Sequence, residues 1–368
     1  MKVGFQPPAV GEEEIAAVAE TIRSGWLTTG PKAAELERRL ADYLEAEHVV
    51  ALSSGTAALH LALVALGVGP GDEVITTPIT WPATANVIVH TGATPVFADV
   101  RDGDLNIDPA HVAELVNDRT KALMPVHLAG QPCDLDPLWV LGVPVVEDAA
   151  HATESRYRDR KIGGLSDAAC FSLYATKNLA AGEGGLLATN RADIADAVRG
   201  LQVTRRGDGA AYDLAVPGYK ANLSDVLAAI ALVQLDKLDR HGEIRRRQFT
   251  LYDEAVAELE GVEPLARDAR DTHAHHLYVV RIDGERAGAG RDEYQRALAD
   301  EGISTSIHFL PVHTLSWYRE RFPEQARLPV AERAGQEVLS LPLSPAHPDE
   351  AIEAVIAALR RIHARFRG

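Results

Sequence analysis

The sequence predicts an α/β protein with a mostly parallel central sheet wrapped by helices on both faces, followed by a smaller C-terminal α+β domain. In the first half of the chain, short apolar segments alternate with helical patterns, which is typical of parallel β-α-β units. After about residue 220 this order gives way to a long helical pattern and then to alternating strand-like segments. A chain of 368 residues exceeds one simple core. We therefore expect two domains, residues 1–240 and 241–368.

Two amphipathic helices are expected before the sheet. Residues 12–24 begin with three glutamates and are followed by Gly25, which suit the two ends of a helix. The apolar residues that share one face of this helix are Ile15, Val18 and Ile22. Pro31 suits the start of a second helix, which carries Leu36 and Leu40 on its apolar face.

The short apolar segments that follow are expected to form strands of one sheet that is covered on both faces. These strands are residues 48–54, 73–78, 94–100, 121–127, 143–150, 170–175 and 184–189. Residues 55–67 form a nearly all-apolar helix after the first strand. A long helix over 223–259 is expected to connect the domains. The elements expected beyond it are antiparallel strands over 275–282 and 302–309 and a final helix over 348–366.

Composition and charge exclude several classes of protein. A hydrophobic content of 46% and a charged content of 24% are those of a globular enzyme. The net charge of −16 disfavours a nucleic-acid partner, because the phosphate backbone would be repelled. No apolar run has the length of a membrane-spanning helix, and the N-terminus has no signal-peptide pattern. Since Cys133 and Cys170 are the only cysteines, we expect no disulfide framework and a cytoplasmic location.

Candidate site residues lie where strands end, because ligands of open α/β sheets bind beyond the carboxyl ends of the strands. Residues 53–57, Ser-Ser-Gly-Thr-Ala, join a strand to a helix. Free backbone amides and the helix dipole at such a junction suit a phosphate, although the same residue types also cap helices that bind nothing. Trp81 follows the next strand, where its indole could stack on a planar ligand or fill the core.

Two charged residues also follow buried strands. Asp148 ends one of them, and a buried carboxylate needs a partner such as a protonated heteroaromatic nitrogen, unless it caps the next segment. Lys177 follows another and precedes the glycine-rich turn 182–185. Burial lowers the pKa of a lysine and makes its neutral amine a nucleophile for Schiff-base chemistry, whereas an isolated lysine is usually exposed and inert.

Histidines alternate near the start of the strand expected over 275–282, at His273, His275 and His276. Alternating histidines can bind a metal ion. No carboxylate or cysteine with ligand spacing accompanies them, so no metal site is expected.

The order of phosphate cradle, aromatic residue, carboxylate and lysine along one sheet resembles the fold-type I pyridoxal-5′-phosphate (PLP) enzymes. Over essentially the whole chain, the sequence is similar to the PLP-dependent nucleotide-sugar aminotransferases of the DegT/DnrJ type, and most similar to the sugar 4-aminotransferases. The segments that carry this resemblance are GWLTTGP (25–31), SSGTAALHLAL (53–63), EDAAHA (147–152), FSLYATKN (171–178), GEGG (182–185), GYKANLSDVLAAIALVQLDKLD (218–239) and GISTSIHFLPVH (302–313).

The resemblance implies a role for each candidate. Lys177 corresponds to the catalytic lysine that carries the cofactor, and Asp148 to the carboxylate that keeps the pyridine nitrogen protonated, so that the ring acts as an electron sink. Trp81 corresponds to the aromatic residue that stacks on the ring, and His151 to a polar residue on the cofactor or substrate side. The residues that correspond to the phosphate cradle are Gly55, Thr56, Ala57 and Ser172.

Residues 218–222 depart from the common family pattern Gly-Tyr-Asn-Tyr-Arg, in which the asparagine reaches the partner's cofactor phosphate across a dimer. In this chain Lys220 or Asn222 could make that contact. The resemblance implies a homodimer with shared active sites. The residues expected on the substrate side are Thr28, His308 and His313.

The implied reaction is a transamination in two half-reactions. L-Glutamate gives its amino group to the cofactor, which leaves pyridoxamine 5′-phosphate (PMP) and 2-oxoglutarate. The PMP form then aminates a nucleotide-linked keto-sugar. Because the Lys-and-Asn pattern of 218–222 resembles members that act at carbon 4, the expected substrate is a dTDP-4-keto-6-deoxyhexose. The expected product is of the dTDP-4-amino-4,6-dideoxyglucose type, as in amino-sugar and natural-product biosynthesis.

Several alternatives stay open. The substrate could be a UDP-linked keto-pentose or keto-hexose, or the reaction could take place at carbon 3. The chain could instead be a non-catalytic PLP-binding regulatory protein, which the intact Lys177 and Asp148 disfavour. Related dehydratases have a histidine in place of Lys177. The residues that could bind the glutamate carboxylate are Arg205 and Arg206.

Overall fold

The computed structural model describes residues 2–203 and 216–368. The large domain is built on one continuous sheet. A four-stranded part, β1-β9-β8-β5, and a three-stranded part, β3-β2-β4, lie edge to edge. Parallel pairing of Leu123 with Val145 and of Val126 with Asp148 joins β4 to β5. Every neighbouring pair is parallel except the two that β9 forms with β1 and β8. The strands are β1 (His48–Leu52), β2 (Glu73–Thr76), β3 (Thr94–Phe97), β4 (Thr120–Met124), β5 (Val146–Asp148), β8 (Ala168–Ser172) and β9 (Gly185–Thr189). Each strand predicted for this sheet is therefore confirmed.

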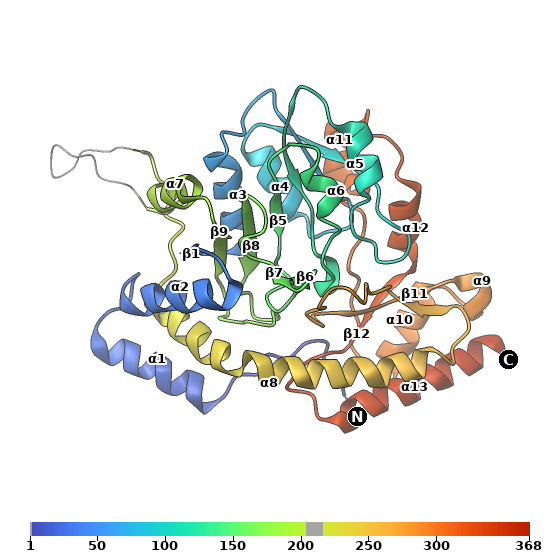
Figure 1. The fold of residues 1–368 in the computed structure, drawn as a ribbon. Coiled ribbons are helices and arrows are strands. Elements are labelled where there is room, and N and C mark those ends of the chain that lie inside the picture. Colours follow the sequence, from blue (N-terminus) through green and yellow to red (C-terminus); the bar gives the residue numbers. More distant parts are fainter. Residues whose placement is uncertain (1, 204–215) are drawn as a thin grey trace, which may run out of the picture.

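Helices cover both faces of the sheet (Figure 1). One face packs against α2 (Pro31–Leu44), α5 (Pro109–Leu115), α6 (Asp136–Trp139) and the first half of α8 (Asp225–Val256). The opposite face packs against α3 (Gly55–Ala65), α4 (Ala83–His90) and α7 (Ala192–Gln202). Side chains of β8 alternate between the two cores, with Phe171 in the first and Cys170 in the second. This two-sided burial explains why the middle of most of these strands is apolar on both faces.

The long helix predicted over residues 223–259 is present as α8, and it packs into two separate cores. Ser224 caps it, since its side chain accepts a hydrogen bond from the backbone amide of Leu227. Leu238, in the first half of the helix, lies in the core of the large domain. Phe249 and Tyr252, in the second half, lie in the core of the small domain. One unbroken helix thus contributes to both cores.

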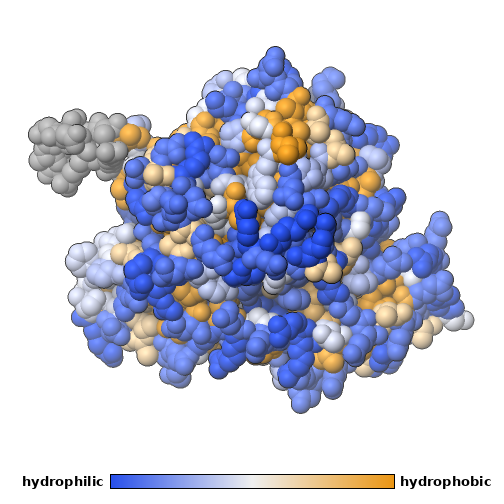
Figure 2. Space-filling model, in the orientation of Figure 1, coloured by the Kyte–Doolittle hydropathy of each residue, from blue (hydrophilic) through white to orange (hydrophobic). Residues whose placement is uncertain are grey.

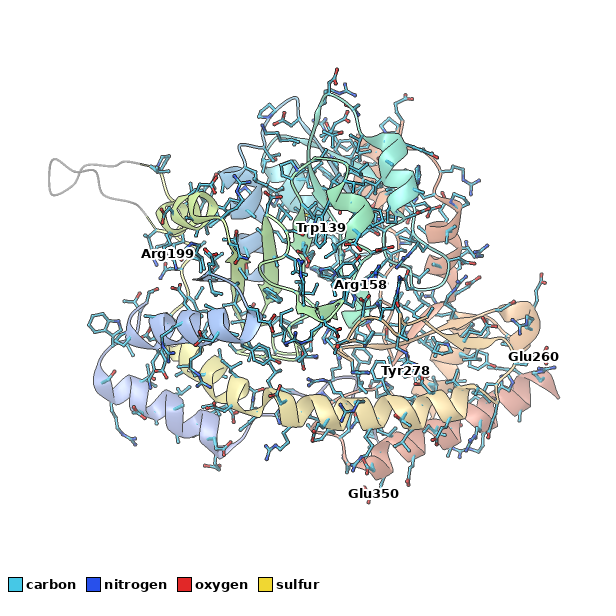
Figure 3. The ribbon with its side chains drawn as sticks, viewed as in Figure 1. Trp139, Arg158, Arg199, Glu260, Tyr278 and Glu350 are labelled. Atoms are coloured by element: carbon cyan, nitrogen blue, oxygen red, sulfur yellow. The ribbon has the colours of Figure 1, made fainter. Side chains whose placement is uncertain are left out.

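The small domain contains an antiparallel sheet in the order β10-β11-β12. The elements of this region are β10 (Val262–Pro264), β11 (Tyr278–Ile282), α9 (Gly284–Ala287), α10 (Arg291–Asp300), η2 (Val312–Thr314), α11 (Ser316–Arg321), α12 (Pro329–Glu337), β12 (Val338–Leu341) and α13 (Asp349–Arg367). Tyr278 of β11 packs its ring 4.9 Å from the ring of Phe249 and 4.8 Å from that of Tyr252 on α8 (Figure 3). Val3 also packs into this core. Since residue 240 lies inside α8, the division into residues 1–240 and 241–368 stays a prediction.

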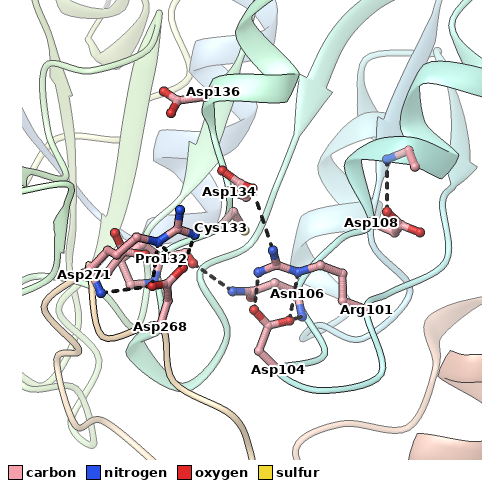
Figure 4. A network of polar contacts seen from close by, with 12 residues as sticks. Arg101, Asp104, Asn106, Asp108, Pro132, Cys133, Asp134, Asp136, Asp268 and Asp271 are labelled. Carbon is pink, nitrogen blue, oxygen red and sulfur yellow. Dashed lines mark hydrogen bonds and ion pairs between the residues drawn. The ribbon is translucent and has the colours of Figure 1, made fainter.

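Polar contacts link the loop after β4 to residues 268–271, and Figure 4 shows part of the surrounding network, including the contact of Asn106 with Pro132. The side chain of Gln131 donates to Asp271 Oδ2 at 3.3 Å and accepts from the backbone amide of Asp268 at 3.2 Å. Asn106 Nδ2 donates to the carbonyl oxygens of Gln131 and Pro132 at 3.0 and 3.1 Å. Two short elements lie beside this region, namely the 3₁₀ helix η1 (Leu128–Gly130) and the hairpin of β6 (Arg156–Tyr157) and β7 (Arg160–Lys161). The walls at the domain junction are therefore tied to one another.

Helix α1 (Glu12–Ser24) forms as predicted and ends at Gly25, whose φ is 76°. Its apolar side faces outward, since Ile15 is 61% and Ile22 56% exposed. The side turned to the protein is polar. The carboxylate of Glu14 accepts hydrogen bonds from Gln234 and Lys237 on α8, both to Oε1 at 2.8 and 2.7 Å. The apolar face predicted for this helix therefore has no partner within the described part of the chain.

The strand predicted over residues 302–309 is wrong. Residues there form only single bridges, Ile303 with Val3 and Ser306 with Ser340. A ladder needs a continuous partner strand, whereas these bridges lead to two different segments. The alternating pattern reflects an extended chain that changes partner after a few residues.

Candidate active site

The predicted residues converge on one cavity of about 460 Å³ at the carboxyl ends of the parallel strands. Of the predicted residues, those that line this cavity are Gly55, Thr56, Trp81, Asp148, His151, Ser172, Lys177 and His308. They come from segments far apart in the sequence, since β1, β5 and β8 all end there. The arrangement follows the rule that ligands bind beyond the carboxyl ends of strands in such sheets.

The N-terminus of α3 provides a cradle for an anion. Ser54 caps the helix by accepting a hydrogen bond from the amide of Ala57 at 3.0 Å. The first-turn amides of Gly55 and Thr56 have no acceptor within the helix, and both residues line the cavity. A Cβ on Gly55 would lie 3.1 Å from the Cβ of Ser172. Glycine thus lets the start of α3 and the end of β8 approach closely enough to surround a phosphate group.

Asp148 is a buried carboxylate, only 5% exposed, at the end of β5. Its Oδ2 accepts a hydrogen bond from Thr84 Oγ1 at 2.8 Å, and its Oδ1 accepts one from the backbone amide of Ala150 at 3.1 Å. Burial raises the pKa of Asp148, while these two hydrogen bonds and the positive charge of Lys177 oppose the rise. A cationic partner in the cavity would stabilise the ionised form.

Lys177 follows β8 in a turn that is closed by its own amide, which donates to the carbonyl of Tyr174 at 2.8 Å. Burial lowers the pKa of Lys177 to about 8, and the carboxylate of Asp148 opposes this shift. At pH 7 about a tenth of the amine is therefore neutral and nucleophilic, far more than for an exposed lysine with its pKa near 10.4. Both properties suit a lysine that forms a Schiff base.

Aromatic residues and histidines form the rest of the wall. Trp81 is 65% exposed, and its ring lies 6.4 Å from that of Phe309. The ring of His151 stacks on the same Phe309 ring at a distance of 6.0 Å. It also lies 4.4 Å from the ring of His276. The indole is thus accessible to a planar ligand, and imidazole side chains lie across the same cavity.

Other residues that line the cavity were not selected from the sequence. The polar and aromatic ones are Gln6, Thr84, Tyr174, Thr176, Glu183, His276 and Phe309. Tyr174 and Thr176 lie in the segment 171–178 that carries the family resemblance, but no role was predicted for either of them from the sequence. Gln6 and His276 reach the cavity only through tertiary packing.

Five predicted residues do not line this cavity: Thr28, Ala57, Lys220, Asn222 and His313. The amide of Ala57 is used by the helix cap. Lys220 Nζ donates to Asn222 Oδ1 at 2.5 Å, and Asn222 Nδ2 donates to Thr29 Oγ1 at 2.5 Å. His313 lies beside Phe97, with a ring distance of 6.1 Å, and its Nε2 is 3.6 Å from Glu332. A role for these five residues within their own chain's cavity has no geometric support.

His273 and His275, which alternate in the sequence as metal ligands can, have packing roles. His273 Nδ1 accepts a hydrogen bond from the amide of His275 at 2.8 Å, and both rings contact Phe249. Within residues 2–203 and 216–368, no group of three or more His, Cys, Asp or Glu side chains is placed to hold a metal ion. Arg205 and Arg206, the candidates for the glutamate carboxylate, lie outside the described residues.

None of the helices in the described ranges is long and apolar enough to cross a membrane. On the face shown in Figure 2, hydrophilic residues predominate and the hydrophobic ones form small, separate groups.

Comparison with known proteins shows to which family the chain is similar. The model of the DegT/DnrJ/EryC1/StrS aminotransferase family matches residues 8–360. The spore coat polysaccharide biosynthesis protein SpsC of Bacillus subtilis (strain 168) is 45% identical over 375 residues, which cover 97% of this chain and 96% of SpsC. The PLP form of the putative sugar aminotransferase Spr1654 from Streptococcus pneumoniae has a TM-score of 0.92 and 32% identity, with both chains covered to 100%. DesI, crystallised in the presence of its TDP-sugar product, has a TM-score of 0.91 and 34% identity over 100% of this chain and 94% of its own.

The fold and the site together define a fold-type I PLP-dependent aminotransferase. The chain belongs to the DegT/DnrJ/EryC1/StrS aminotransferase family. The fold class, the enzyme class and the PLP cofactor predicted from the sequence are thereby confirmed. The residues present fit this cofactor on structural grounds as well. A glycine cradle at a helix N-terminus suits its phosphate, the buried Asp148 suits a protonated ring nitrogen, and the depressed pKa of Lys177 suits its aldehyde.

Proposed function

We propose that this enzyme transfers the amino group of L-glutamate to a nucleotide-linked keto-sugar in the biosynthesis of a deoxyamino-sugar. The observation that carries this proposal is that Lys177 and Asp148 line one cavity together with the cradle at Gly55. A neutral amine, a buried carboxylate and an anion cradle are the groups that a PLP-dependent transamination requires of the protein.

Each residue has a distinct task in this proposal. Lys177 Nζ would hold the cofactor and, as a free amine, would move a proton at the carbon that bears the amino group. Asp148 keeps the ring nitrogen of the cofactor protonated. Bound PLP supplies an electron sink for the negative charge that develops at that carbon. The side chains proposed to hold the phosphate and the ring are Thr56, Ser172, Trp81 and His151, with the backbone of Gly55.

For the sugar, we propose a dTDP-4-keto-6-deoxyhexose that is aminated at carbon 4. The TDP-sugar product of the structural neighbour DesI supports a dTDP-linked substrate. The relation to the polysaccharide biosynthesis protein SpsC supports a sugar substrate in general. The same chemistry on a UDP-linked keto-pentose or keto-hexose, or at carbon 3, is the alternative. Turnover measured on a panel of these nucleotide sugars separates them.

We also propose a homodimer with shared active sites. The exposed apolar side of α1, with Ile15 and Ile22, is the surface of a helix that lacks a partner in the described chain. Lys220 and Asn222 lie outside the cavity of their own chain, so a role at a cofactor phosphate requires the cavity of a second copy. Sedimentation of the native protein and of an Ile15→Glu/Ile22→Glu variant tests this, since charges on the face should produce a monomer.

The enzyme is proposed to work in the cytoplasm. Cys133 and Cys170 are buried and free, as expected for a protein of a reducing compartment. We propose neither a nucleic acid nor a membrane as a partner, in keeping with the net charge of −16.

The test of the proposed function is the visible absorption spectrum of the PLP-loaded protein before and after addition of L-glutamate. We expect the band of the lysine-bound cofactor to be replaced by that of PMP, and we expect Lys177→Ala to show no turnover. A native protein that keeps PLP but does not respond to any amino acid would instead be a PLP-binding protein without this activity. A response to another amino acid alone would change the donor.

A further inference from the structure

His276 lines the cavity, and its hydrogen bonds determine which of its ring nitrogens carries the proton. The residue lies just before β11 and is only 2% exposed. Its backbone carbonyl accepts a hydrogen bond from Gln6 Nε2 at 2.9 Å, which fixes the segment. Its Nδ1 lies 3.0 Å from Oδ1 of Asn178, the residue that follows the proposed catalytic lysine.

Asn178 can act only as an acceptor toward this imidazole. Its Nδ2 lies 2.8 Å from a carboxylate oxygen of Glu154 and 2.8 Å from the carbonyl oxygen of Ala274. Both of these partners are acceptors, so they must face the NH₂ group of the amide. The other end of the amide, which faces His276, is therefore the oxygen, and His276 Nδ1 must be the donor. Glu154 is in turn held by an ion pair with Arg245.

The imidazole of His276 is neutral in this environment. Burial lowers its pKa well below the usual value, and so do the charges that Lys177, His308, Arg245 and His273 can carry. A neutral imidazole has one N–H group, which is at Nδ1 here. Nε2 therefore presents a lone pair, and the described residues provide no hydrogen-bond donor to it.

The neighbouring His151 has the opposite tautomer. Its Nδ1 accepts a hydrogen bond from the backbone amide of Ala129 at 3.3 Å, and an amide N–H can only donate. Burial, together with the nearby Lys177 and His276, lowers the pKa of His151 well below its usual value, so this ring is neutral too. Its proton is then on Nε2. Two imidazoles 4.4 Å apart thus offer the cavity one donor and one acceptor.

We propose that Nε2 of His276 accepts a hydrogen bond from a hydroxyl group of the sugar substrate, and that Asn178 is the positioning residue that keeps this nitrogen unprotonated. The proposal rests on the proposed function and assigns to it a residue that distinguishes the two substrates. L-Glutamate presents carboxylates in addition to its reacting amine, and a lone pair repels a carboxylate. A keto-sugar presents hydroxyl groups, which donate. An acceptor at this position therefore serves the sugar half-reaction and contributes nothing to the glutamate half-reaction.

The kinetic test compares two substitutions of His276 in the PLP-loaded enzyme. In His276→Asn, the shorter amide can still donate to Asn178 but has no atom at the position of Nε2. We expect KM for the keto-sugar to rise roughly tenfold, the loss of one hydrogen bond, while the rate of conversion by L-glutamate stays unchanged. His276→Gln, whose amide reaches the position of Nε2, should restore most of the loss. His273→Gln removes an imidazole that does not line the cavity and should change neither half-reaction.

Equal losses in both half-reactions of His276→Asn, or an unchanged KM for the sugar, would overturn the proposal. A native enzyme that L-glutamate cannot convert would refute the proposed function instead, so the two failures are distinguishable.

A second measurement does not depend on activity. In the holoenzyme labelled with ¹⁵N-histidine, the nitrogen shifts of His276 should show a protonated Nδ1 and an unprotonated Nε2 near neutral pH, with assignment by the loss of signals in His276→Asn. Asn178→Leu removes the acceptor of the Nδ1 proton, so in this variant either ring nitrogen of His276 should be able to carry the proton. An Nε2–H tautomer or a charged ring in the native protein would exclude the proposed acceptor.

Discussion

Thr84 Oγ1 donates a hydrogen bond of 2.8 Å to Oδ2 of Asp148. Thr84 has a single hydroxyl proton, and its Oγ1 also lies 2.7 Å from Thr80 Oγ1 and 3.2 Å from the carbonyl oxygen of Trp81, so the carboxylate is the nearer and stronger of its two acceptors. Since the carboxylate takes the proton of Thr84, Thr80 must donate to Thr84 in turn. A chain of two hydroxyl groups, Thr80 just before α4 and Thr84 in its first turn, thus supports the ionised form of Asp148, against the effect of burial on its pKa.

This relationship predicts that Thr84→Val weakens cofactor binding. A hydrogen bond to a charged group contributes about 1.5–3 kcal/mol, so we expect the Kd for PLP to rise by roughly ten- to a hundredfold. Thr84→Ser keeps the hydroxyl group and should bind PLP nearly as the native protein does. Titration of the cofactor-free proteins with PLP measures both, and equal affinities of the valine and native proteins would contradict the prediction.

The amine of Lys177, which is partly buried at the cavity wall, predicts how the stability of the cofactor-free protein depends on pH. Its pKa is about 8 in the folded state against 10.5 for an ordinary lysine. Between these values the unfolded chain binds more protons than the folded one, so the contribution of Lys177 to the free energy of unfolding rises with pH across this window. Below pH 8 Lys177 is charged in both states, and the full cost of keeping this charge away from water lowers the free energy of unfolding. Lys177→Met should therefore be more stable than the native protein in this pH range.

The measurement is thermal unfolding of the two cofactor-free proteins over this pH range. The difference between them isolates Lys177, because burial also lowers the pKa of Lys161 to about 8 in both. The advantage of the methionine variant should shrink as pH rises toward 10.5. An advantage that does not vary with pH would indicate a packing effect instead.

The close packing of backbone against Gly185 predicts that this position cannot accommodate a side chain. A Cβ at this position of β9 would overlap the backbone carbonyl of Ser54, the residue that caps α3. Gly185→Ala should therefore push the start of α3 out of place, with a loss of stability of about 1–3 kcal/mol and weaker PLP binding. At Gly4 a Cβ would meet no atom within 4 Å, so Gly4→Ala is the matched control. Urea unfolding and PLP titration of both variants check this.

Asp148 and Lys177 could be selected from the sequence because Asp148 ends the buried strand β5 and Lys177 lies in the turn that follows the buried strand β8. His276 could not, because its meaning depends on Asn178, 98 positions earlier in the chain. The tautomer of a histidine follows from partners that only tertiary packing brings together. Sequence position identifies the residues of a sheet edge, but not the walls that a second domain adds.

The same limit appears in the fold. The pattern of α1 correctly predicts a helix and its apolar side. It does not predict which side is turned to α8: Glu14 contacts α8, whereas Ile15 faces outward. Residues 302–309 alternate like a strand, but their neighbours are divided between Val3 and Ser340. Periodicity describes the local conformation of a segment, whereas its partners depend on the rest of the chain.

The ion pair of Arg245 with Glu154 predicts a strong and non-additive effect on stability. Both side chains are largely buried, and the second carboxylate oxygen of Glu154 accepts the hydrogen bond from Asn178. Arg245→Met leaves the carboxylate without this partner, which should lower the free energy of unfolding by about 3–5 kcal/mol. In the double variant Arg245→Met/Glu154→Gln no buried charge is left uncompensated, so most of that loss should be recovered.

Arg247, on the same helix, forms a largely exposed ion pair with Asp349 at 2.6 Å, so Arg247→Met should cost at most about 1 kcal/mol. Urea unfolding of the native protein, the single variants Arg245→Met and Glu154→Gln and the double variant measures the coupling, with Arg247→Met as the control. A double variant as unstable as Arg245→Met alone would show that lost packing, and not the uncompensated carboxylate, causes the effect.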